Sequence, residues 1–532
     1  GRVVQGASSA LRHWKFDSGA IASTRAPVPL ASASEREAAQ PYFRTELAAE
    51  VANGSVRWWA RANEHGGFMN EQQNRSPHDT EAVAVPAGRP GLLCVWRVDT
   101  QKCIDASPLI VERFLPEAGV AAANSEALAY IGSHSGEFLC VDIRTGSMRW
   151  TCQLPDRLES SAAISASGKL VFVGCYDGSL YAVNAESGTI AWSSKTGGEV
   201  KAAPCVPAPS LSSAPSREGV AVAAESVWVG SFDKCIYALD ANSGALLLRH
   251  TTEGAFYSSA TSSAGLVLCA NLKGQERQAL TYIWSSARTS KVFAFEAEAF
   301  KLVWSVEVGH AIFASLRVDE AAGIVLVGAV DGLLRALSLG DGSQLWACDS
   351  GGPIFATPCV HRLNSGGSVY YAGSQAGHVL CVSANGLPLW RARGPGGGHS
   401  APSTFGELLI VGSADGALLV LSATSGAELA TIQLPGAVHS SPVVYSSRSL
   451  VLVGCRDNSL YCFKLTTAGS RPGRQAHDEP LDGACSPAVE LDIADAAERS
   501  RQARLLVLSR VLGNLTRVPP SGEIARPRNH DN

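Results

Sequence analysis

The stretch Val171–Trp192, which reads VFVGCYDGSLYAVNAESGTIAW, contains three short runs of alternating residues separated by two turns. The first turn is built on Asp177-Gly178 and the second on Ser187-Gly188. Asp-Gly and Ser-Gly pairs supply the positive φ angles that tight β-hairpins need. We therefore expect three antiparallel strands within this stretch.

The same pattern recurs along the chain, so this stretch is one unit of a repeat. Each unit opens with a short segment of small residues, continues into an apolar strand, and is followed by a strand like Leu180–Val183. Small residues suit an innermost strand because neighbouring blades converge on the axis. Eight units follow at intervals of roughly 40 to 58 residues, which is the period of propeller blades. The sequence predicts an all-β fold, an eight-bladed β-propeller with four strands in each blade.

Tryptophan ends most of the units. The eighth unit has none of its own, whereas residues 92–98 resemble the last strand of a unit and contain Trp96. Leu248 and Ala430 replace tryptophan in two other units. We expect the N-terminal strand to complete the last blade and close the ring, because closure removes free sheet edges. The other terminal tryptophans are Trp150, Trp192, Trp304, Trp346 and Trp390.

The chain is expected to have three parts. Residues 1–90 carry no sustained hydrophobic period and are interpreted as a disordered linker, with a short helix near Glu46–Trp59. Residues 91–466 form the propeller, and residues 467–532 form a polar tail with helical spacing over Ala488–Leu512. The first residue is glycine rather than methionine, and no signal segment follows it, so we expect this chain to be a fragment of a longer protein.

Composition excludes two classes of partner. The formal net charge of −4 shows no basic excess, which argues against nucleic acid. No apolar run approaches the roughly 18–20 residues of a membrane span. The 14 cysteines include no C-x-x-C motif, and most lie in apolar strand patterns, which favours reduced, buried thiols over a disulfide framework. This cysteine usage predicts a reducing, cytoplasmic location, with organelle targeting left open.

The repeat resembles a known family. The unit V-G-x-x-D-G-x-L-Y-A-x-x-x-x-S-G-x-x-x-W resembles the pyrroloquinoline-quinone (PQQ)-like repeat of quinoprotein alcohol dehydrogenase-like propellers. More particularly, Val95–Pro108 (VWRVDTQKCIDASP) and Leu452–Tyr461 (LVGCRDNSLY) look like the C-terminal propeller of beta-alanine-activating enzymes, which belong to the acyl-CoA synthetase family. The resemblance covers about residues 92–465.

The resemblance implies a non-catalytic module of an ATP-dependent, acid-activating ligase. Adenylation and carrier domains would precede the propeller in the same polypeptide and would be its first partners. ATP, Mg²⁺ and phosphopantetheine are expected only in those missing domains, because no adenylation loop and no carrier G-G-x-S motif precedes Leu92. No catalytic, cofactor-binding or metal-binding residue is therefore assigned to this chain.

Two other interpretations stay open. A quinoprotein oxidoreductase would need a calcium site with about six to eight oxygen ligands, a catalytic aspartate and an adjacent cysteine pair. The chain has no Cys-Cys pair, and no carboxylate set for calcium is recognisable in the sequence. The other interpretation is a stand-alone propeller scaffold that has no connection to a ligase.

The candidate binding surface is the mouth of the central channel. The residue before each pair of small inner-strand residues should reach one common height near the axis, with one arc charged and the other aromatic. We expect this ring to bind a small acyl or aminoacyl group or an acceptor protein. The alternative is that its charged residues only neutralise one another around a hydrated channel, and a zinc site at its two histidines lacks a third ligand. The ring consists of Asp105, Glu159, Lys201, Tyr257, Phe313, Phe355, His399 and His439.

Overall fold

The computed structural model describes residues 57–61, 90–114, 125–208, 225–273, 289–363, 366–393 and 396–467. The chain divides into two compact units, Gly1–Arg44 and Thr45–Asn532, and every described residue lies in the second. Most of the expected linker, and all of the expected polar tail beyond Thr467, lie outside the described residues.

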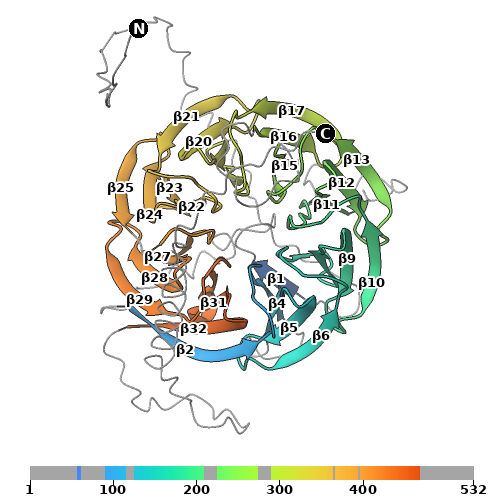
Figure 1. Ribbon diagram of the computed structural model, residues 1–532, viewed down its shortest axis with the longest axis horizontal. Helices are drawn as coiled ribbons and strands as arrows, with labels where there is room; N and C mark the ends of the chain where they lie inside the picture. Colours follow the sequence, from blue (N-terminus) through green and yellow to red (C-terminus); the bar gives the residue numbers. More distant parts are fainter. Residues whose placement is uncertain are drawn as a thin grey trace, which may run out of the picture. The chain divides into compact units, whose positions relative to one another are not determined.

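Eight antiparallel sheets surround a common axis, as the sequence predicts (Figure 1). Blade 1 contains β1 (Arg57–Arg61), β3 (Leu109–Phe114), β4 (Ser125–Gly132), β5 (Glu137–Asp142) and β6 (Met148–Gln153). Blade 2 contains β7 (Ala163–Ile164), β8 (Leu170–Gly174), β9 (Ser179–Asn184) and β10 (Ile190–Lys195). Blade 3 contains β11 (Ser226–Gly230), β12 (Cys235–Asp240) and β13 (Leu246–Thr251). Blade 4 contains β14 (Thr261–Ser263), β15 (Leu266–Ala270), β16 (Lys291–Glu296) and β17 (Lys301–Glu307).

The second half of the ring repeats the same order. Blade 5 contains β18 (Arg317–Asp319), β19 (Ile324–Gly328), β20 (Leu333–Ser338) and β21 (Gln344–Asp349). Blade 6 contains β22 (Cys359–Arg362), β23 (Ser368–Gly373), β24 (His378–Ser383) and β25 (Pro388–Arg393). Blade 7 contains β26 (Ser403–Phe405), β27 (Leu408–Gly412), β28 (Ala417–Ser422) and β29 (Glu428–Gln433). Blade 8 contains β30 (Val443–Tyr445), the 3₁₀ turn η2 (Ser446–Arg448), β31 (Leu450–Cys455), β32 (Ser459–Thr467) and β2 (Pro90–Asp99).

Two departures from four-stranded blades concern the innermost strand. In blade 3 that strand is reduced to a single antiparallel bridge between Cys205 and Trp228. In blade 1 an extra strand, β1, pairs with β3, so that Arg57 lies opposite Phe114. The helix expected near Glu46–Trp59 is therefore wrong for Arg57–Trp59, which are extended.

The N-terminal strand closes the ring, which confirms the expectation from Trp96. β2 pairs with β32 in antiparallel register along its whole length, from Pro90 opposite Thr467 to Asp99 opposite Ser459. Figure 1 places β2 at the periphery, in the same position that β6, β10 and β13 occupy in their blades. β2, near the N-terminal end of the described chain, and β32, its last described strand, are thus neighbours in one sheet.

Each terminal tryptophan joins its blade to the next one. The indole N–H of Trp150 donates to the carbonyl of Ala185 at 3.1 Å, and the ring lies against Gly188. Gly188 has a φ of +73°, and a Cβ there would lie 2.7 Å from the indole ring, which explains the Ser-Gly turn in the repeat. The corresponding donor–acceptor pairs are Trp96–Ile143, Trp192–Ala241, Trp304–Leu339, Trp346–Ala384 and Trp390–Ala423.

The small residues of the inner strands form a ring of hydrogen bonds between blades. The N–H of Ser441 donates to the hydroxyl of Ser107 at 3.0 Å, and the N–H of Ser107 donates to the hydroxyl of Ser161 at 2.9 Å. The pattern is interrupted after Ser161 and Thr357, where the next blade offers Ala203 or Ala401, which have no hydroxyl. The remaining pairs, donor first, are Ala203–Ser259, Ser259–Ser315, Ser315–Thr357 and Ala401–Ser441.

The cysteines are free thiols, as the sequence predicts for those in apolar strands. Of the cysteines within the described ranges, Cys94 and Cys103 are partly exposed and all others are buried. Burial raises the pKa of the Cys455 thiol to about 12, which suits a small core residue rather than a nucleophile. A search of the described residues finds no helix long and apolar enough to cross a membrane.

Candidate functional site at the channel mouth

The eight residues predicted to share one height do form one ring, which we call the channel mouth. Five of them, from five consecutive blades, make an aromatic arc in which neighbouring ring centroids are 5.0–5.4 Å apart. His399 is exposed and the other seven mouth residues are half-buried, so the arc faces solvent. The aromatic arc consists of Tyr257, Phe313, Phe355, His399 and His439, and the polar arc of Asp105, Glu159 and Lys201.

Backbone hydrogen bonds fix the height of the mouth. In seven blades the residue two positions after the end of the second strand donates its N–H to the carbonyl two positions before a mouth residue. In blade 8 Arg456, directly after β31, makes the corresponding hydrogen bond to Ala437. The N–H of Tyr176, for example, donates to the Arg157 carbonyl at 3.2 Å, next to Glu159. This second tier consists of His134, Tyr176, Phe232, Leu272, Val330, Gln375, Ala414 and Arg456. This tier is not recognisable from the type of side chain, although each member lies two positions after a glycine or alanine at or next to the end of the second strand.

Asp105 is held by two side chains of the second tier. The guanidinium of Arg456 donates two hydrogen bonds to its carboxylate, at 2.7 and 2.6 Å, and Nε2 of His134 lies 3.3 Å away. Burial by itself would raise the pKa of Asp105, but Arg456 and His134 outweigh burial and hold that pKa far below its usual range. Asp105 is therefore a fixed negative charge that is already paired.

His439, at the end of the aromatic arc, is held in the neutral form. Burial, followed by the positive charge of Arg456, lowers the pKa of His439 to about 4. At neutral pH this imidazole is therefore an aromatic ring in contact with His399 rather than a cation. The two histidines considered for zinc thus belong to the aromatic arc.

Glu159 is surrounded by several weaker partners. Its carboxylate lies 3.5 Å from Nζ of Lys201, 3.6 Å from Nε of Arg157 and 3.7 Å from Nε2 of His134. None of these distances is that of a close hydrogen bond. Glu159 is thus less firmly paired than Asp105.

Lys201 connects the polar arc to the aromatic arc. Its ammonium nitrogen lies 4.7 Å from the ring centroid of Tyr176, 5.2 Å from that of Phe232 and 5.9 Å from that of Tyr257. We call these three rings the Lys201 cage. All three distances are within the range in which a cation is attracted to the face of an aromatic ring. The expected mutual neutralisation of Asp105, Glu159 and Lys201 is thus only partial, because Asp105 pairs with Arg456.

Within the described residues, one group of side chains is close enough together to share a metal ion. The ligand atoms of Asp105, His134 and Glu159 lie within 4.8 Å of one another. The group does not fit the calcium of a quinoprotein, which needs about six to eight oxygen ligands. Arg456 and Lys201 also place two positive charges against the same carboxylates. No step of quinone chemistry is therefore derived for this site.

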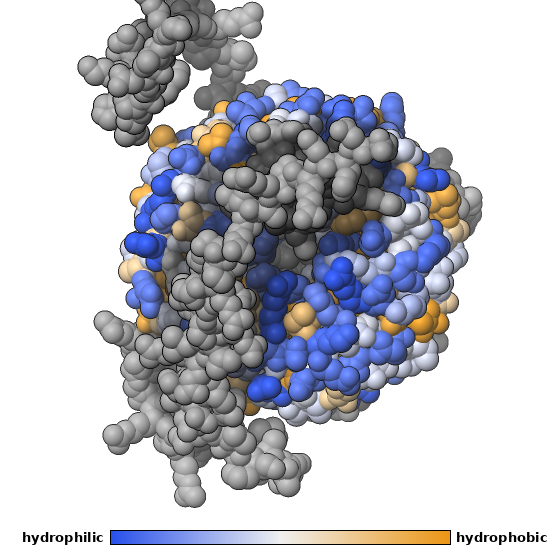
Figure 2. Space-filling view, in the orientation of Figure 1, coloured by the Kyte–Doolittle hydropathy of each residue, from blue (hydrophilic) through white to orange (hydrophobic). Residues whose placement is uncertain are grey.

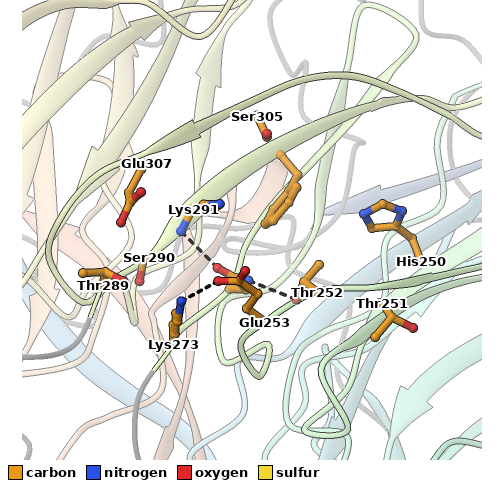
Figure 3. A pocket seen from close by; sticks show the side chains of 12 residues that line it. His250, Thr251, Thr252, Glu253, Lys273, Thr289, Ser290, Lys291, Ser305 and Glu307 are labelled. Carbon is orange, nitrogen blue, oxygen red and sulfur yellow. Dashed lines mark hydrogen bonds and ion pairs between the residues drawn. The ribbon is translucent and has the colours of Figure 1, made fainter.

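A separate pocket of about 290 Å³ lies between blades 3 and 4 (Figure 3). Its lining is polar apart from Phe293, and Lys273 donates a 2.6 Å hydrogen bond to Glu253 across it. The side chain of Asn271 further bonds Thr252 at 3.0 Å. Ligand pockets are predominantly apolar with a few polar groups, so the channel mouth is the better candidate site.

The fold is that of an eight-bladed β-propeller. The solved structure of BamB from Moraxella catarrhalis matches 71% of this chain and 99% of its own, with a TM-score of 0.51 at 16% identity. Quinohemoprotein alcohol dehydrogenase from Comamonas testosteroni matches 72% of this chain and 78% of its own, with a TM-score of 0.52 at 14% identity. These likenesses show the fold alone.

A family model described as "Beta-alanine-activating enzyme, beta-propeller" matches residues 100–465, and the chain belongs to that family. The beta-alanine-activating enzyme of Danio rerio is 37% identical over 123 residues, which are 22% of this chain and 10% of that enzyme. The enzyme of Drosophila melanogaster is 25% identical over 297 residues, which are 44% of this chain and 28% of that enzyme. The matched region is thus less than a third of either relative.

Proposed function

We propose that this chain is the non-catalytic propeller module of an ATP-dependent, acid-activating ligase of the beta-alanine-activating type. The family match over residues 100–465 carries this proposal. The adenylation and carrier domains, with ATP, Mg²⁺ and phosphopantetheine, would lie upstream in the same polypeptide. The free, mostly buried thiols support a cytoplasmic location for the whole protein.

The module's task would be to bind the activated aminoacyl group, or the acceptor that receives it, at the channel mouth. The solvent-facing aromatic arc offers contact area for an apolar chain, and the polar arc offers charged groups for the end of that chain. Aromatic side chains that are only half-buried, and adjacent to one another, are typical of a binding surface rather than of a core.

The ligase part of the proposal is tested by the transcript upstream of the Gly1 codon. In-frame adenylation and carrier domains would support it. A stop codon or a secretion signal immediately upstream would refute it and would leave a stand-alone scaffold.

The binding part is tested by calorimetric titration of the full chain with β-alanyl-pantetheine, its thioester replaced by a stable amide. We expect binding to wild type and its loss in the triple variant Asp105→Ala, Glu159→Ala, Lys201→Ala. An exposed carboxylate outside the mouth, changed by Asp341→Ala, serves as the matched control and should bind like wild type. Equal binding by the triple variant and wild type would refute a role of the mouth.

A further inference from the structure

The Lys201 cage is composed of groups that recognise ammonium ions. Its three rings come from three neighbouring blades: Tyr176 follows β8, Phe232 follows β11, and Tyr257 precedes β14. Glu159, 3.5 Å from the ammonium nitrogen, adds a negative charge. Aromatic faces together with a carboxylate are the recurring solution for binding organic ammonium groups. Here the chain's own lysine occupies that arrangement.

Lys201 leaves part of this site unsatisfied. Tyr176 is only 9% exposed, and its hydroxyl is buried without a hydrogen-bond partner in the described part of the chain. Burial, together with the nearby Glu159 carboxylate, raises the pKa of Tyr176 far above its usual range, so the hydroxyl is neutral. Nε2 of His134 is also buried, 3.3 Å from Asp105 and 3.7 Å from Glu159, so it already faces both carboxylates. A phenol oxygen can accept a hydrogen bond.

The type of cation follows from these groups. A ligand that completes the site must bring an N–H donor as well as positive charge, because the Tyr176 hydroxyl oxygen beside Glu159 can accept a hydrogen bond. A primary ammonium has three N–H donors and is attracted to aromatic faces. A divalent metal ion such as Ca²⁺ would need about six to eight oxygen ligands, more than Glu159 and the Tyr176 hydroxyl offer.

Lys201 itself is easily displaced. Its side chain is 28% exposed, and its distance from Glu159 is that of a loose ion pair. Its flexible stem allows the ammonium to leave the cage without movement of the backbone.

We propose that the Lys201 cage is a binding site for the primary ammonium group of a small amine or aminoacyl ligand, and that Lys201 occupies it as an internal competitor in the free chain. This inference rests on the proposed function of the mouth. It adds which end of the ligand binds at the cage and which end binds along the aromatic arc. The ligand's ammonium takes the place of the Lys201 ammonium, because Arg157 already lies 3.7 Å from the Tyr176 ring centroid and 3.6 Å from Glu159. The rest of the ligand extends along the aromatic arc.

The test is calorimetric titration of the full chain with propylammonium chloride, with 1-propanol as the neutral probe of similar shape. Removing the competitor by Lys201→Ala should tighten propylammonium binding about tenfold or more. Lys201→Gln, which keeps most of the stem but removes the charge, should tighten it in the same direction and covers the case in which the alanine variant folds poorly. Tetramethylammonium, which has no N–H donor, should bind the alanine variant more weakly than propylammonium.

Two second-site changes show whether the cage is responsible. In the Lys201→Ala background, Glu159→Gln and Phe232→Leu should each abolish the gain. Lys195→Ala is the matched control, because Lys195 also lies 3.8 Å from a carboxylate, that of Asp177, but belongs to no aromatic cage. Unchanged affinity in both Lys201 variants, equal binding of 1-propanol, or the same gain in Lys195→Ala would overturn the proposal.

The outcome separates this inference from the proposed function. Binding of β-alanyl-pantetheine amide with no propylammonium binding by either Lys201 variant would overturn the ammonium site and leave the function of the mouth standing. Propylammonium binding that follows the expected variant pattern, without binding of the pantetheine ligand, would support the site and refute that function.

Discussion

Gly386→Ala should destabilise the propeller strongly, because two separate penalties meet at this turn. Gly386 has a φ of +81°, and a Cβ there would lie 2.7 Å from Cγ and Cδ2 of Trp346. Trp346 cannot easily move aside, because its indole N–H donates to the Ala384 carbonyl at 3.0 Å and its ring stacks on Tyr370. A left-handed alanine costs about 1–2 kcal/mol, and overpacking against a fixed ring costs about 1–3 kcal/mol. The expected loss of stability is about 2–5 kcal/mol.

Two glycines in the same blade separate these penalties. Gly366 has a φ of +88°, but no atom of the described residues lies within 4 Å of a Cβ built there, so Gly366→Ala should show only the backbone cost of about 1–2 kcal/mol. Gly367 likewise has no described atom within 4 Å and lies outside the left-handed region, so Gly367→Ala should be close to neutral. In thermal unfolding followed by circular dichroism, Gly367→Ala should have the highest midpoint temperature, Gly366→Ala an intermediate one and Gly386→Ala the lowest. Equal midpoints for the last two would refute the argument that the indole requires glycine beside it.

Four further predictions concern the ring and its mouth. Ser441→Ala should cost about 1–3 kcal/mol in denaturant unfolding, because a buried N–H loses its acceptor; no change would mean that water replaces the hydroxyl. Asp105→Asn should lower the free energy of unfolding by about 1–2 kcal/mol at pH 7. Because the pKa of Asp105 is lower in the folded than in the unfolded state, this difference from wild type should shrink progressively as the pH falls below about 4. A constant difference down to pH 2 would contradict this. The pKa of His439 is about 4 in the folded chain and about 6.5 in the unfolded chain, so the free energy of unfolding of wild type should fall by up to about 3 kcal/mol between pH 6.5 and pH 4. His439→Gln should abolish this loss of stability. An unchanged pH profile in that variant would exclude His439 as its source. Iodoacetamide mapping of the native chain should label Cys94 and Cys103 and spare the buried cysteines of the described ranges; efficient labelling of the buried set would contradict the closed core.

The fold could be predicted from the sequence because the residues that specify each blade are close together in the chain and recur from blade to blade. A turn glycine, an alternating strand and a terminal tryptophan recur in nearly every unit, so the blade count needs no knowledge of distant contacts. Trp96 predicted the closing strand for the same reason, since it was the only part of its unit present at the N-terminal end. By contrast, nothing around Arg57–Arg61 repeats, and the pairing of β1 with β3 could not be foreseen.

Only part of the channel mouth could be predicted from the sequence. The residue before each small pair could be aligned from blade to blade, and the eight aligned residues do meet. The second tier was missed because its members share a position but no chemistry, from His134 and Arg456 to Leu272. Their pairing with the mouth decides which charges are satisfied. The assignment of Asp105 to Arg456 rather than to Lys201 therefore required coordinates.

The outer strands also carry a pattern that the function does not use. Apolar side chains such as Leu93, Leu246 and Leu389 are exposed by 54–60% on the outermost strands of their blades. Figure 2 shows apolar residues scattered among hydrophilic ones toward the periphery of the visible face. The exposed leucines of the outermost strands are thus separate from the channel mouth.

The pairing of β2 with β32 also constrains the order in which the blades can form during synthesis. Arg97 on β2 donates to Ser459 on β32, a residue 362 positions later in the chain. At typical translation rates the ribosome needs on the order of 20 to 70 seconds to produce that interval. During this time β2 has no partner strand, so blade 8 must assemble last and the earlier blades must wait as an open arc. A nascent chain that stalls before Ser459 therefore presents two unpaired sheet edges to the cell's chaperones.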